Sequence, residues 1–290
     1  MKSSQLLFFR LLTRSSGSRG SLAIPFTFRR NWIGPRYGDG TTGAGESGGP
    51  PLNSPPMRAI LMRTCLSDVI APTVWQAAQT VLERAGVSVS VPKAQTCCGQ
   101  PGWSSGHPEE SRRVARKTLQ TFAGDDPVVI PSGSCAAMLT HGYIDLFQGE
   151  PEEAEARHLA TRTFEFSQFL VANDLEIPVP DTGSVTYHDS CHMLRLLGER
   201  GSARATLAGV ELREMADTTV CCGFGGTFSV NFPEVSGSLG EAKARNAAAT
   251  GAETLVACDL SCLMHIAGRA RRVGVPLRVR HLAELLAGDE

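Results

Sequence analysis

The cysteines of this 290-residue chain recur as a repeated pattern. A leading cysteine is followed by a Cys-Cys-Gly triplet and then by a further cysteine, once in each half of the chain. The corresponding positions are Cys65 and Cys191, Cys97 and Cys221, Cys98 and Cys222, and Cys135 and Cys262. Landmarks that return at a nearly constant separation indicate an internal duplication. The chain is therefore expected to contain two tandem copies of one module.

The number and arrangement of the nine cysteines favour metal binding over disulfide bonds. Disulfide frameworks are typical of short secreted chains, and adjacent cysteines rarely bond well because their side chains diverge. Four soft thiolates per module suit zinc or an iron–sulfur cluster and no hard cation. Two adjacent thiolates seldom chelate one tetrahedral ion, whereas a polynuclear cluster offers each its own metal atom. An iron–sulfur cluster is favoured, and a structural zinc site and a thiol–disulfide enzyme remain alternatives.

Hydrophobic and turn patterns predict alternating strands and helices in both copies. In the first copy we expect strands at 58–63, 87–91 and 128–130 and helices at 72–85, 108–122 and 136–147. In the second copy we expect strands at 185–187 and 254–257 and helices at 233–249 and 260–271. This alternation predicts an α/β fold of two pseudo-symmetric modules, each a small parallel sheet with flanking helices. The cysteines follow strand ends, where parallel α/β sheets form their sites.

Composition divides the chain into four segments. Residues 1–56 are rich in arginine and poor in acids, and they end in a stretch dominated by Gly, Pro, Ser and Thr. We expect this segment to be a disordered or misassigned extension, with a targeting peptide as a further option. Residues 57–150 and 184–290 are expected to be the two modules, and 151–183 a helical linker.

The overall composition narrows the class of protein. Apolar residues make up 42% of the chain, which suits a globular core. Charged residues make up 20% and the formal net charge is −1, so no nucleic-acid partner is expected. No apolar run approaches the ~20 residues of a spanning helix, so no transmembrane segment is expected.

Residues beside the cysteines suggest further roles. Gly99 and Gly223 follow the two cysteine pairs, and we expect their amides to donate to the sulfurs and to tune a cluster's potential. His188 and His192 flank Cys191, and for them a hydrogen bond that structures the loop is preferred over metal ligation.

Five segments of the chain resemble a known family. They are TCCGQP at 96–101, PSGSCAAM at 131–138, YHDSCH at 187–192, CCGFGGTFSV at 221–230 and SCLMHIAGR at 261–269. They are similar to the lactate utilization A branch of the cysteine-rich CCG-domain family. That family includes the iron–sulfur subunit of glycolate oxidase, the C-type subunit of anaerobic glycerol-3-phosphate dehydrogenase and the B-type subunit of heterodisulfide reductase. The resemblance spans roughly residue 57 to the C-terminus.

The resemblance implies an iron–sulfur electron-transfer subunit, non-catalytic or co-catalytic, of a cytoplasmic complex that oxidises L-lactate to pyruvate. It implies partner subunits of the lactate utilization B and C types. An iron–sulfur subunit of glycolate or another 2-hydroxyacid oxidase is the alternative within the same class. Whether the chain itself contacts L-lactate is left open.

The resemblance also implies a ligand set. In heterodisulfide reductase, such modules hold non-cubane [4Fe–4S] clusters through five cysteines. Carried over here, the second module offers Cys191, Cys221, Cys222, Cys258 and Cys262. The first module offers Cys65, Cys97, Cys98 and Cys135, because Pro131 stands where Cys258 would repeat. The expected cofactor is an iron–sulfur cluster, [4Fe–4S] in type, with one or two per chain.

Overall fold

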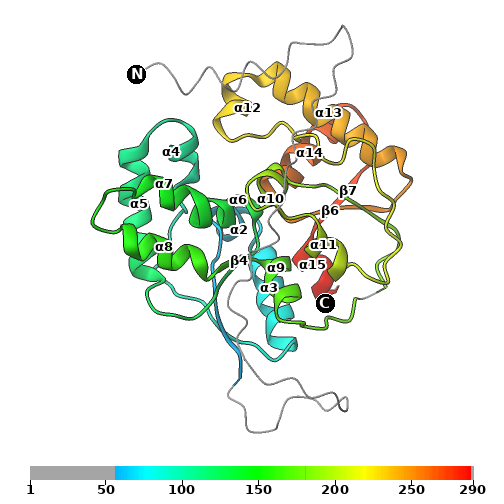
Figure 1. Ribbon diagram of the computed structural model, residues 1–290. Helices are drawn as coiled ribbons and strands as arrows, with labels where there is room; N and C mark the ends of the chain where they lie inside the picture. The colour runs from blue at the N-terminus through cyan, green and yellow to red at the C-terminus, as the bar shows by residue number, and fades with distance from the viewer. Residues whose placement is uncertain (1–55, 180, 289–290) are drawn as a thin grey trace, which may run out of the picture. The chain divides into compact units, whose positions relative to one another are not determined.

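The computed structural model describes residues 56–179 and 181–288, which form two parallel β-sheets with flanking helices (Figure 1). The first sheet has the order β2-β1-β3-β4, and the second has the order β5-β6-β7. The strands are β1 (Arg58–Leu61), β2 (Ser88–Ser90), β3 (Val128–Ile130), β4 (Thr163–Glu165), β5 (Val185–Tyr187), β6 (Thr254–Ala257) and β7 (Arg278–His281). Every pairing between these strands is parallel, which confirms the predicted α/β class.

The helices lie in the order that the pattern of each module predicts. In the first module and the segment after it they are α2 (Cys65–Ile70), α3 (Pro72–Arg84), α4 (Gln100–Ser104), α5 (Pro108–Thr121), α6 (Gly133–Ala137), the π-helical η1 (Met138–Gly142), α7 (Tyr143–Leu146), α8 (Glu153–Thr161) and α9 (Phe166–Ala172). In the second they are α10 (Cys191–Arg195), α11 (Gly201–Thr206), α12 (Thr227–Asn231), α13 (Pro233–Ala249), α14 (Leu260–Arg272) and α15 (Leu282–Ala287). Proline opens α3, α5 and α13, where the missing N–H costs no helical hydrogen bond.

Three strands, β3, β5 and β6, are covered on both faces. Every residue of β3, β5 and β6 is buried, whereas the outer strands β2 and β7 are partly exposed. Continuous apolar runs such as Val128–Ile130 are typical of parallel strands between helical layers. Within the described residues, no helix combines the length and the apolar composition that crossing a bilayer requires. The expected N-terminal extension, apart from its last residue, lies outside the described part of the chain.

The segment 151–183, expected to be a helical linker, also contributes a strand to the first sheet. β4 pairs with β3 and leads into α9, where Glu165 and Gln168 form a capping box. The second module ends in the same way, because β7 leads into α15, where His281 and Glu284 form a capping box. β4 reads Thr-Phe-Glu and lacks the continuous apolar run by which the equally short β3 was predicted. Each repeat therefore ends in a strand and a capped helix.

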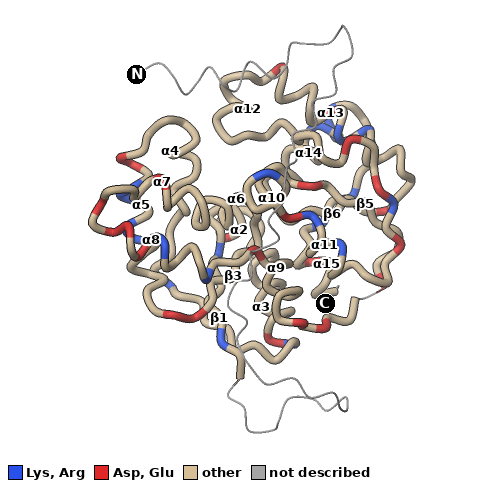
Figure 2. The backbone as a smooth tube through the Cα atoms, in the orientation of Figure 1, with Lys and Arg blue, Asp and Glu red and all other residues tan. Residues whose placement is uncertain are grey.

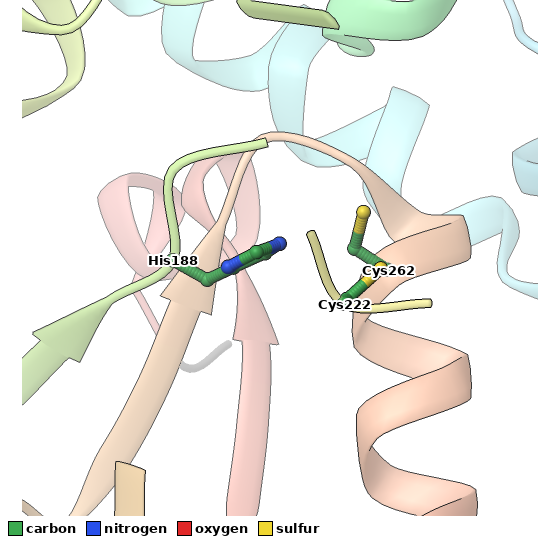
Figure 3. Close-up of side chains that lie close together, drawn as sticks. All are labelled: His188, Cys222 and Cys262. Atoms are coloured by element: carbon green, nitrogen blue, oxygen red, sulfur yellow. The ribbon is translucent and has the colours of Figure 1, made fainter. Parts of the chain in front are cut away.

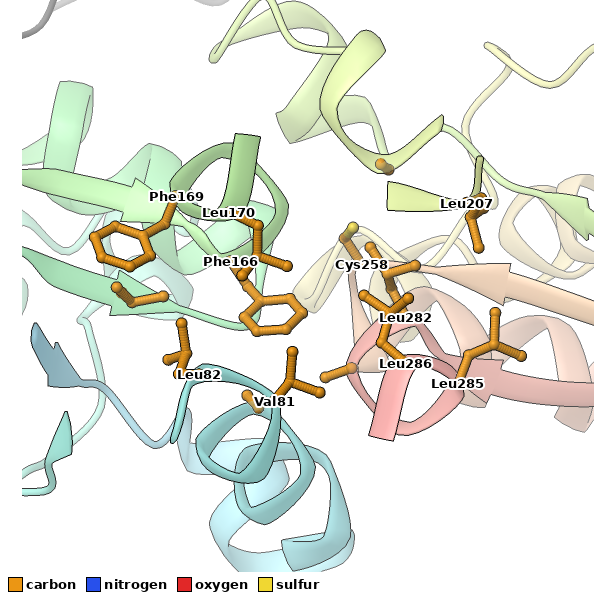
Figure 4. Packing of buried hydrophobic residues seen from close by; sticks show 14 of the residues in the cluster. Val81, Leu82, Phe166, Phe169, Leu170, Leu207, Cys258, Leu282, Leu285 and Leu286 are labelled. Atoms are coloured by element: carbon orange, nitrogen blue, oxygen red, sulfur yellow. The ribbon is translucent and has the colours of Figure 1, made fainter. Parts of the chain in front are cut away.

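The two modules share one apolar cluster (Figure 4). α3 packs against α15, and α9 packs against α11, so the capped terminal helix of each copy lies against the helix that follows the leading-cysteine helix of the other copy. The labelled members of the cluster are Val81, Leu82, Phe166, Phe169, Leu170, Leu207, Cys258, Leu282, Leu285 and Leu286. Thr73 Oγ1 also donates a hydrogen bond to Glu284 Oε1 at 2.6 Å. The copies are thus joined through a common core rather than through a linker alone.

A buried ion pair fixes the loop after β5. Asp189 is 2% exposed, and its carboxylate accepts hydrogen bonds from Arg204 Nη1 at 2.7 Å and Arg200 Nε at 3.1 Å. The Arg204 guanidinium also lies over the ring of Tyr187, 5.1 Å from its centroid. Burial alone would raise the pKa of Asp189, but the hydrogen bonds and charges of Arg204 and Arg200 outweigh it and lower the pKa.

We expect Arg204→Ala to reduce the free energy of unfolding by about 3 kcal/mol, because it leaves the buried Asp189 carboxylate without its main partner. The matched control is Arg213→Ala, whose ion pair with Glu211 is exposed to solvent and is expected to cost less than about 1 kcal/mol. Urea unfolding of both variants measures the difference. Equal, small losses would show that the buried pair contributes no more than the surface pair.

Candidate metal centres

Four cysteines of the first module lie together at the carboxyl edge of the first sheet. Cys65 opens α2 directly after β1, Cys97 and Cys98 precede α4, and Cys135 lies in α6 after β3. The Sγ atoms of Cys65 and Cys97 are 3.7 Å apart, and those of Cys98 and Cys135 are 3.5 Å apart. The thiols of Cys97 and Cys98 also contact each other. The four groups therefore form one continuous series.

The second module repeats this series. Cys191 opens α10, Cys221 and Cys222 precede α12, and Cys262 lies in the first turn of α14. The thiol of Cys191 contacts that of Cys221, and the thiol of Cys222 contacts those of Cys221 and Cys262. The correspondence between the cysteines of the two copies is thus present in space as well as in sequence.

One thiol of each series is favoured as the thiolate. Hydrogen bonds from Cys65 and then Cys98 lower the pKa of Cys97, and those from Cys191 and then Cys222 lower the pKa of Cys221. The pKa of a donating thiol changes in the opposite direction. The hydrogen bond that Cys65 donates to Cys97 therefore raises the pKa of Cys65. In the second series the hydrogen bond from Cys222 also lowers the pKa of Cys262, to about 7. Metal binding requires deprotonated thiols, and each series already stabilises at least one of them.

The glycine of each triplet brings a backbone amide to the sulfur. Gly99 N donates to Cys97 Sγ at 3.4 Å, and Gly223 N donates to Cys221 Sγ at 3.3 Å. Both glycines have a φ near +90°, which is the left-handed region that other residues rarely adopt. A Cβ at Gly223 would also lie 2.5 Å from the backbone oxygen of Ser236. The local geometry therefore requires glycine at the position that the sequence repeats.

His188 lies against the second series (Figure 3). It follows β5 directly, is 0% exposed, and offers a ring nitrogen within 4.8 Å of the Sγ atoms of Cys222 and Cys262. Its imidazole interacts with the Cys262 thiol, and neither ring nitrogen has a further hydrogen-bond partner, so it does not make the loop-structuring bond that the sequence suggested. His192 does make such contacts, since its Nε2 lies 2.5 Å from Gln100 Nε2 and its Nδ1 lies 3.6 Å from Cys191 Sγ.

Cys258 lies apart from the other four cysteines of its module. It is fully buried in the apolar cluster that the modules share, and Tyr187 donates a hydrogen bond to its Sγ at 3.1 Å. Its other polar neighbour is Glu165, whose pKa burial raises to about 7. In the described chain, no hydrogen bond joins Cys258 Sγ to another cysteine. Its place as a fifth ligand stays a prediction.

A buried carboxylate connects the two series. Asp259 Oδ1 accepts hydrogen bonds from Ser134 N at 3.1 Å and Ser134 Oγ at 2.9 Å, and Oδ2 accepts one from Ser190 Oγ. Ser134 precedes Cys135 and Ser190 precedes Cys191, so one side chain holds a cysteine-bearing loop of each module. Burial raises the pKa of Asp259, but the hydrogen bonds outweigh that effect and lower it. This role of Asp259 was not expected from the sequence, where its position beside Cys258 was the only signal.

The surroundings of the two series differ in charge. The short helices after the triplets, α4 and α12, carry no charged residue (Figure 2). Ser105 Oγ at the end of α4 lies 3.1 Å from the Oγ1 of Thr227, the first residue of α12. Lys243 of α13 is 1% exposed and donates its Nζ to the backbone oxygens of Asp217 and Thr218. Burial lowers the pKa of Lys243, and the nearby Cys222 thiol acts in the opposite direction. The second series therefore has a buried cation close by.

The duplicated cysteine site corresponds to a known domain. A family model described as a cysteine-rich domain, CCG, matches residues 60–140 and again 185–267, once in each module. Lactate utilization protein A of Shouchella clausii is 45% identical over 243 residues, covering 81% of this chain and 100% of the relative. The chain belongs to the lactate utilization A family of cysteine-rich domain proteins.

Other members of the lactate utilization A family match to a similar extent. The proteins of this name from Halalkalibacterium halodurans and Geobacillus thermodenitrificans are 44% and 43% identical, covering 81% and 79% of this chain and 98% of each relative. A crystal structure of a hypothetical protein from Helicobacter pylori superimposes with a TM-score of 0.55 at 10% identity. It covers 82% of this chain and 50% of that one, and this likeness shows the fold alone.

The residues of this family member fit a metal or an iron–sulfur cofactor. Each module offers four thiols in contact, an amide donor to one of them and an apolar setting. Soft sulfur ligands of this kind select zinc or iron–sulfur clusters over hard cations.

We expect Asp259→Ala to reduce the free energy of unfolding of the metal-free protein by roughly 3 kcal/mol, because it leaves the hydroxyls of Ser132 and Ser190 without their acceptor. Asp126→Ala is the control, since Asp126 forms a partly exposed ion pair with Arg58 and is expected to cost less than about 1 kcal/mol. Urea unfolding gives the energies. Hydrogen exchange at the Ser134 amide should accelerate only in Asp259→Ala, and unchanged protection there would contradict the connecting role.

Proposed function

We propose that this chain is the iron–sulfur electron-transfer subunit of a cytoplasmic complex that oxidises L-lactate to pyruvate. The observation that carries the proposal is the duplicated series of four thiols, each built around an adjacent cysteine pair. The names of the relatives supply the link to lactate. Two [4Fe–4S] clusters per chain, one per module, account for both series.

The geometry of the adjacent pairs favours a cluster over a single zinc ion. Cys97 contacts Cys65 while Cys98 contacts Cys135, so the neighbouring thiols are directed to different partners. A polynuclear cluster has separate metal atoms for such thiols, whereas structural zinc sites use cysteines spaced by two to four residues. The proposed ligands are Cys65, Cys97, Cys98 and Cys135 in the first module and Cys191, Cys221, Cys222 and Cys262 in the second.

The protein's own residues would hold and tune the cofactor. A bound cluster supplies one-electron transfer, and the fold decides its environment. Gly99 and Gly223 donate amides to the sulfurs, and such hydrogen bonds raise the potential of a cluster by stabilising its more negative, reduced state. Asp259 fixes the loops of Cys135 and Cys191 relative to each other, which keeps the two sites at a constant separation.

The proposal includes partners of the lactate utilization B and C types. Oxidation of a 2-hydroxy acid to a 2-oxo acid releases two electrons and two protons, and an electron-transfer subunit must pass those electrons on. The alternative within this class is a subunit of a glycolate or other 2-hydroxyacid oxidase. The 39% to 45% identity to proteins named for lactate utilization supports lactate.

Replacing the adjacent pairs by serine should remove one cluster at a time. We expect the double variant Cys97→Ser/Cys98→Ser to lose about half of the bound iron and sulfide, and Cys221→Ser/Cys222→Ser to lose the other half, because each pair supplies half of its module's thiolates. Anaerobic purification with iron, sulfide and zinc assays, visible spectra and EPR measures this. A colourless, redox-silent protein that contains zinc after attempted reconstitution would overturn the proposal.

Cys258→Ala is the matched control for these variants. Cys258 lies outside the thiol series, so iron and sulfide are expected to stay at the level of the unaltered protein. Loss of the second cluster in Cys258→Ala would instead show that Cys258 is a fifth ligand.

Substrate specificity is tested with the assembled complex. We expect L-lactate to bleach the visible absorption of the clusters when the chain is co-purified with partners of the lactate utilization B and C types, because electrons from lactate reduce them. Glycolate should bleach it at least tenfold more slowly. A complex that lacks both cysteine pairs should show no change with either acid. Faster bleaching by glycolate would contradict lactate as the substrate.

A further inference from the structure

We propose that His188 is a metal ligand of the second module, bound through one ring nitrogen beside Cys222 and Cys262. This inference rests on the proposed function, because it takes the second thiol series to hold a metal cofactor. It goes beyond that function by giving the second module a nitrogen ligand, while the first module has sulfur ligands only.

The imidazole of His188 is buried with no oxygen or backbone partner. His188 is 0% exposed, and apart from the interaction with the Cys262 thiol neither Nδ1 nor Nε2 has a hydrogen-bond partner. A buried polar group without a partner costs about 1–3 kcal/mol, and most such groups in native proteins are satisfied. A metal bond to one nitrogen removes that cost at the place where two thiols, those of Cys222 and Cys262, lie within 4.8 Å of the ring nitrogen and of each other. Figure 3 shows the ring directed from the end of β5 toward these two cysteines.

Comparison with other histidines of the same module supports this assignment. His281 is equally buried, but its Nδ1 accepts from Ala283 N at 3.1 Å and its Nε2 lies 3.0 Å from the backbone oxygen of Cys258. His192 lies next to Cys191, and each of its ring nitrogens has a polar contact. Of these three histidines, only His188 has no oxygen or nitrogen partner at either ring nitrogen, and it is the one beside the thiols of Cys222 and Cys262.

The first module has no imidazole at the equivalent position. His188 stands three residues before Cys191, and Met62 stands three residues before Cys65. Met62 is 0% exposed and packs in the apolar cluster that contains Cys98 and Cys135. A thioether is a weak, neutral group, so the first module relies on its thiols. The two copies therefore share the four cysteines of each series and differ in the residue three positions before the leading cysteine.

The presence of His188 in only one module predicts which of the two clusters has the higher midpoint potential. A neutral imidazole nitrogen adds no negative charge to the cluster, and histidine ligation raises the potential of iron–sulfur centres relative to thiolate ligation. The buried Lys243 near Cys222 acts in the same direction. The second module's cluster should have the higher potential, so electrons that enter through the first module move toward the second.

The decisive test uses the unaltered protein, purified anaerobically with its native cofactor from cells fed ¹⁵N-labelled histidine. Pulsed EPR of the paramagnetic cluster state should show a ¹⁵N coupling from histidine, which selective labelling separates from peptide nitrogens. The variants Cys97→Ser/Cys98→Ser and Cys221→Ser/Cys222→Ser assign the signal, which should persist in the first and vanish in the second.

Three point variants complete the test. His188→Met, which copies the residue of the first module, should abolish the histidine coupling, and His188→Cys should lower the midpoint potential of the second cluster while retaining iron. His192→Gln, the control for the neighbouring histidine, should keep the coupling. A protein with full iron and sulfide but no histidine coupling, or one whose coupling survives in His188→Met, would overturn this inference alone. A protein that binds no cluster would overturn the proposed function as well.

Discussion

Bringing four thiol groups into contact inside a protein is the constraint on which this structure depends. Thiolates repel one another and lose hydration when they are buried, so such a set needs rigid support and nearby donors. In each set, one cysteine follows the first strand of the module, two belong to the Cys-Cys-Gly triplet, and one follows a later strand. The amide of the triplet glycine donates a hydrogen bond to the thiol with the lowest pKa. Parallel strands place these loops at one edge of each sheet, which is why distant cysteines meet.

The second requirement is that the two sites keep a fixed relation. The shared apolar cluster joins α3 and α9 to α15 and α11, and exposing it would cost about 25 cal/mol for each square ångström of apolar surface. Asp259 adds a polar connection at the sites themselves, since it bonds residues just before Cys135 and Cys191. These contacts hold the two thiol series at a fixed separation without a flexible linker.

Duplication produces two similar sites, and later differences give them separate properties. In the second copy His188 occupies the position that Met62 has in the first, and it lies beside the second thiol series. Lys243 adds a buried cation near the same cysteines. Cys258 follows β6 where Pro131 follows β3, but its side chain packs into the common core against Tyr187 and Glu165. Differences of this kind affect charge and ligand type, while the parallel order β1-β3-β4 of the first sheet recurs as β5-β6-β7 in the second.

The sequence by itself determined the duplication, the eight cysteines of the two series and the α/β class. Those features depend on local spacing and periodicity, so they can be read along the chain, as Val128–Ile130 and Pro233–Ala249 illustrate. Only the tertiary structure placed β4 in the first sheet, separated Cys258 from the other cysteines, and showed that Asp259 spans both modules. It also buried His188 beside Cys222 and Cys262 with no oxygen or nitrogen partner for its ring. These outcomes depend on which groups lie next to each other in space, and burial, which decides whether a polar atom needs a partner, is a property of the folded chain.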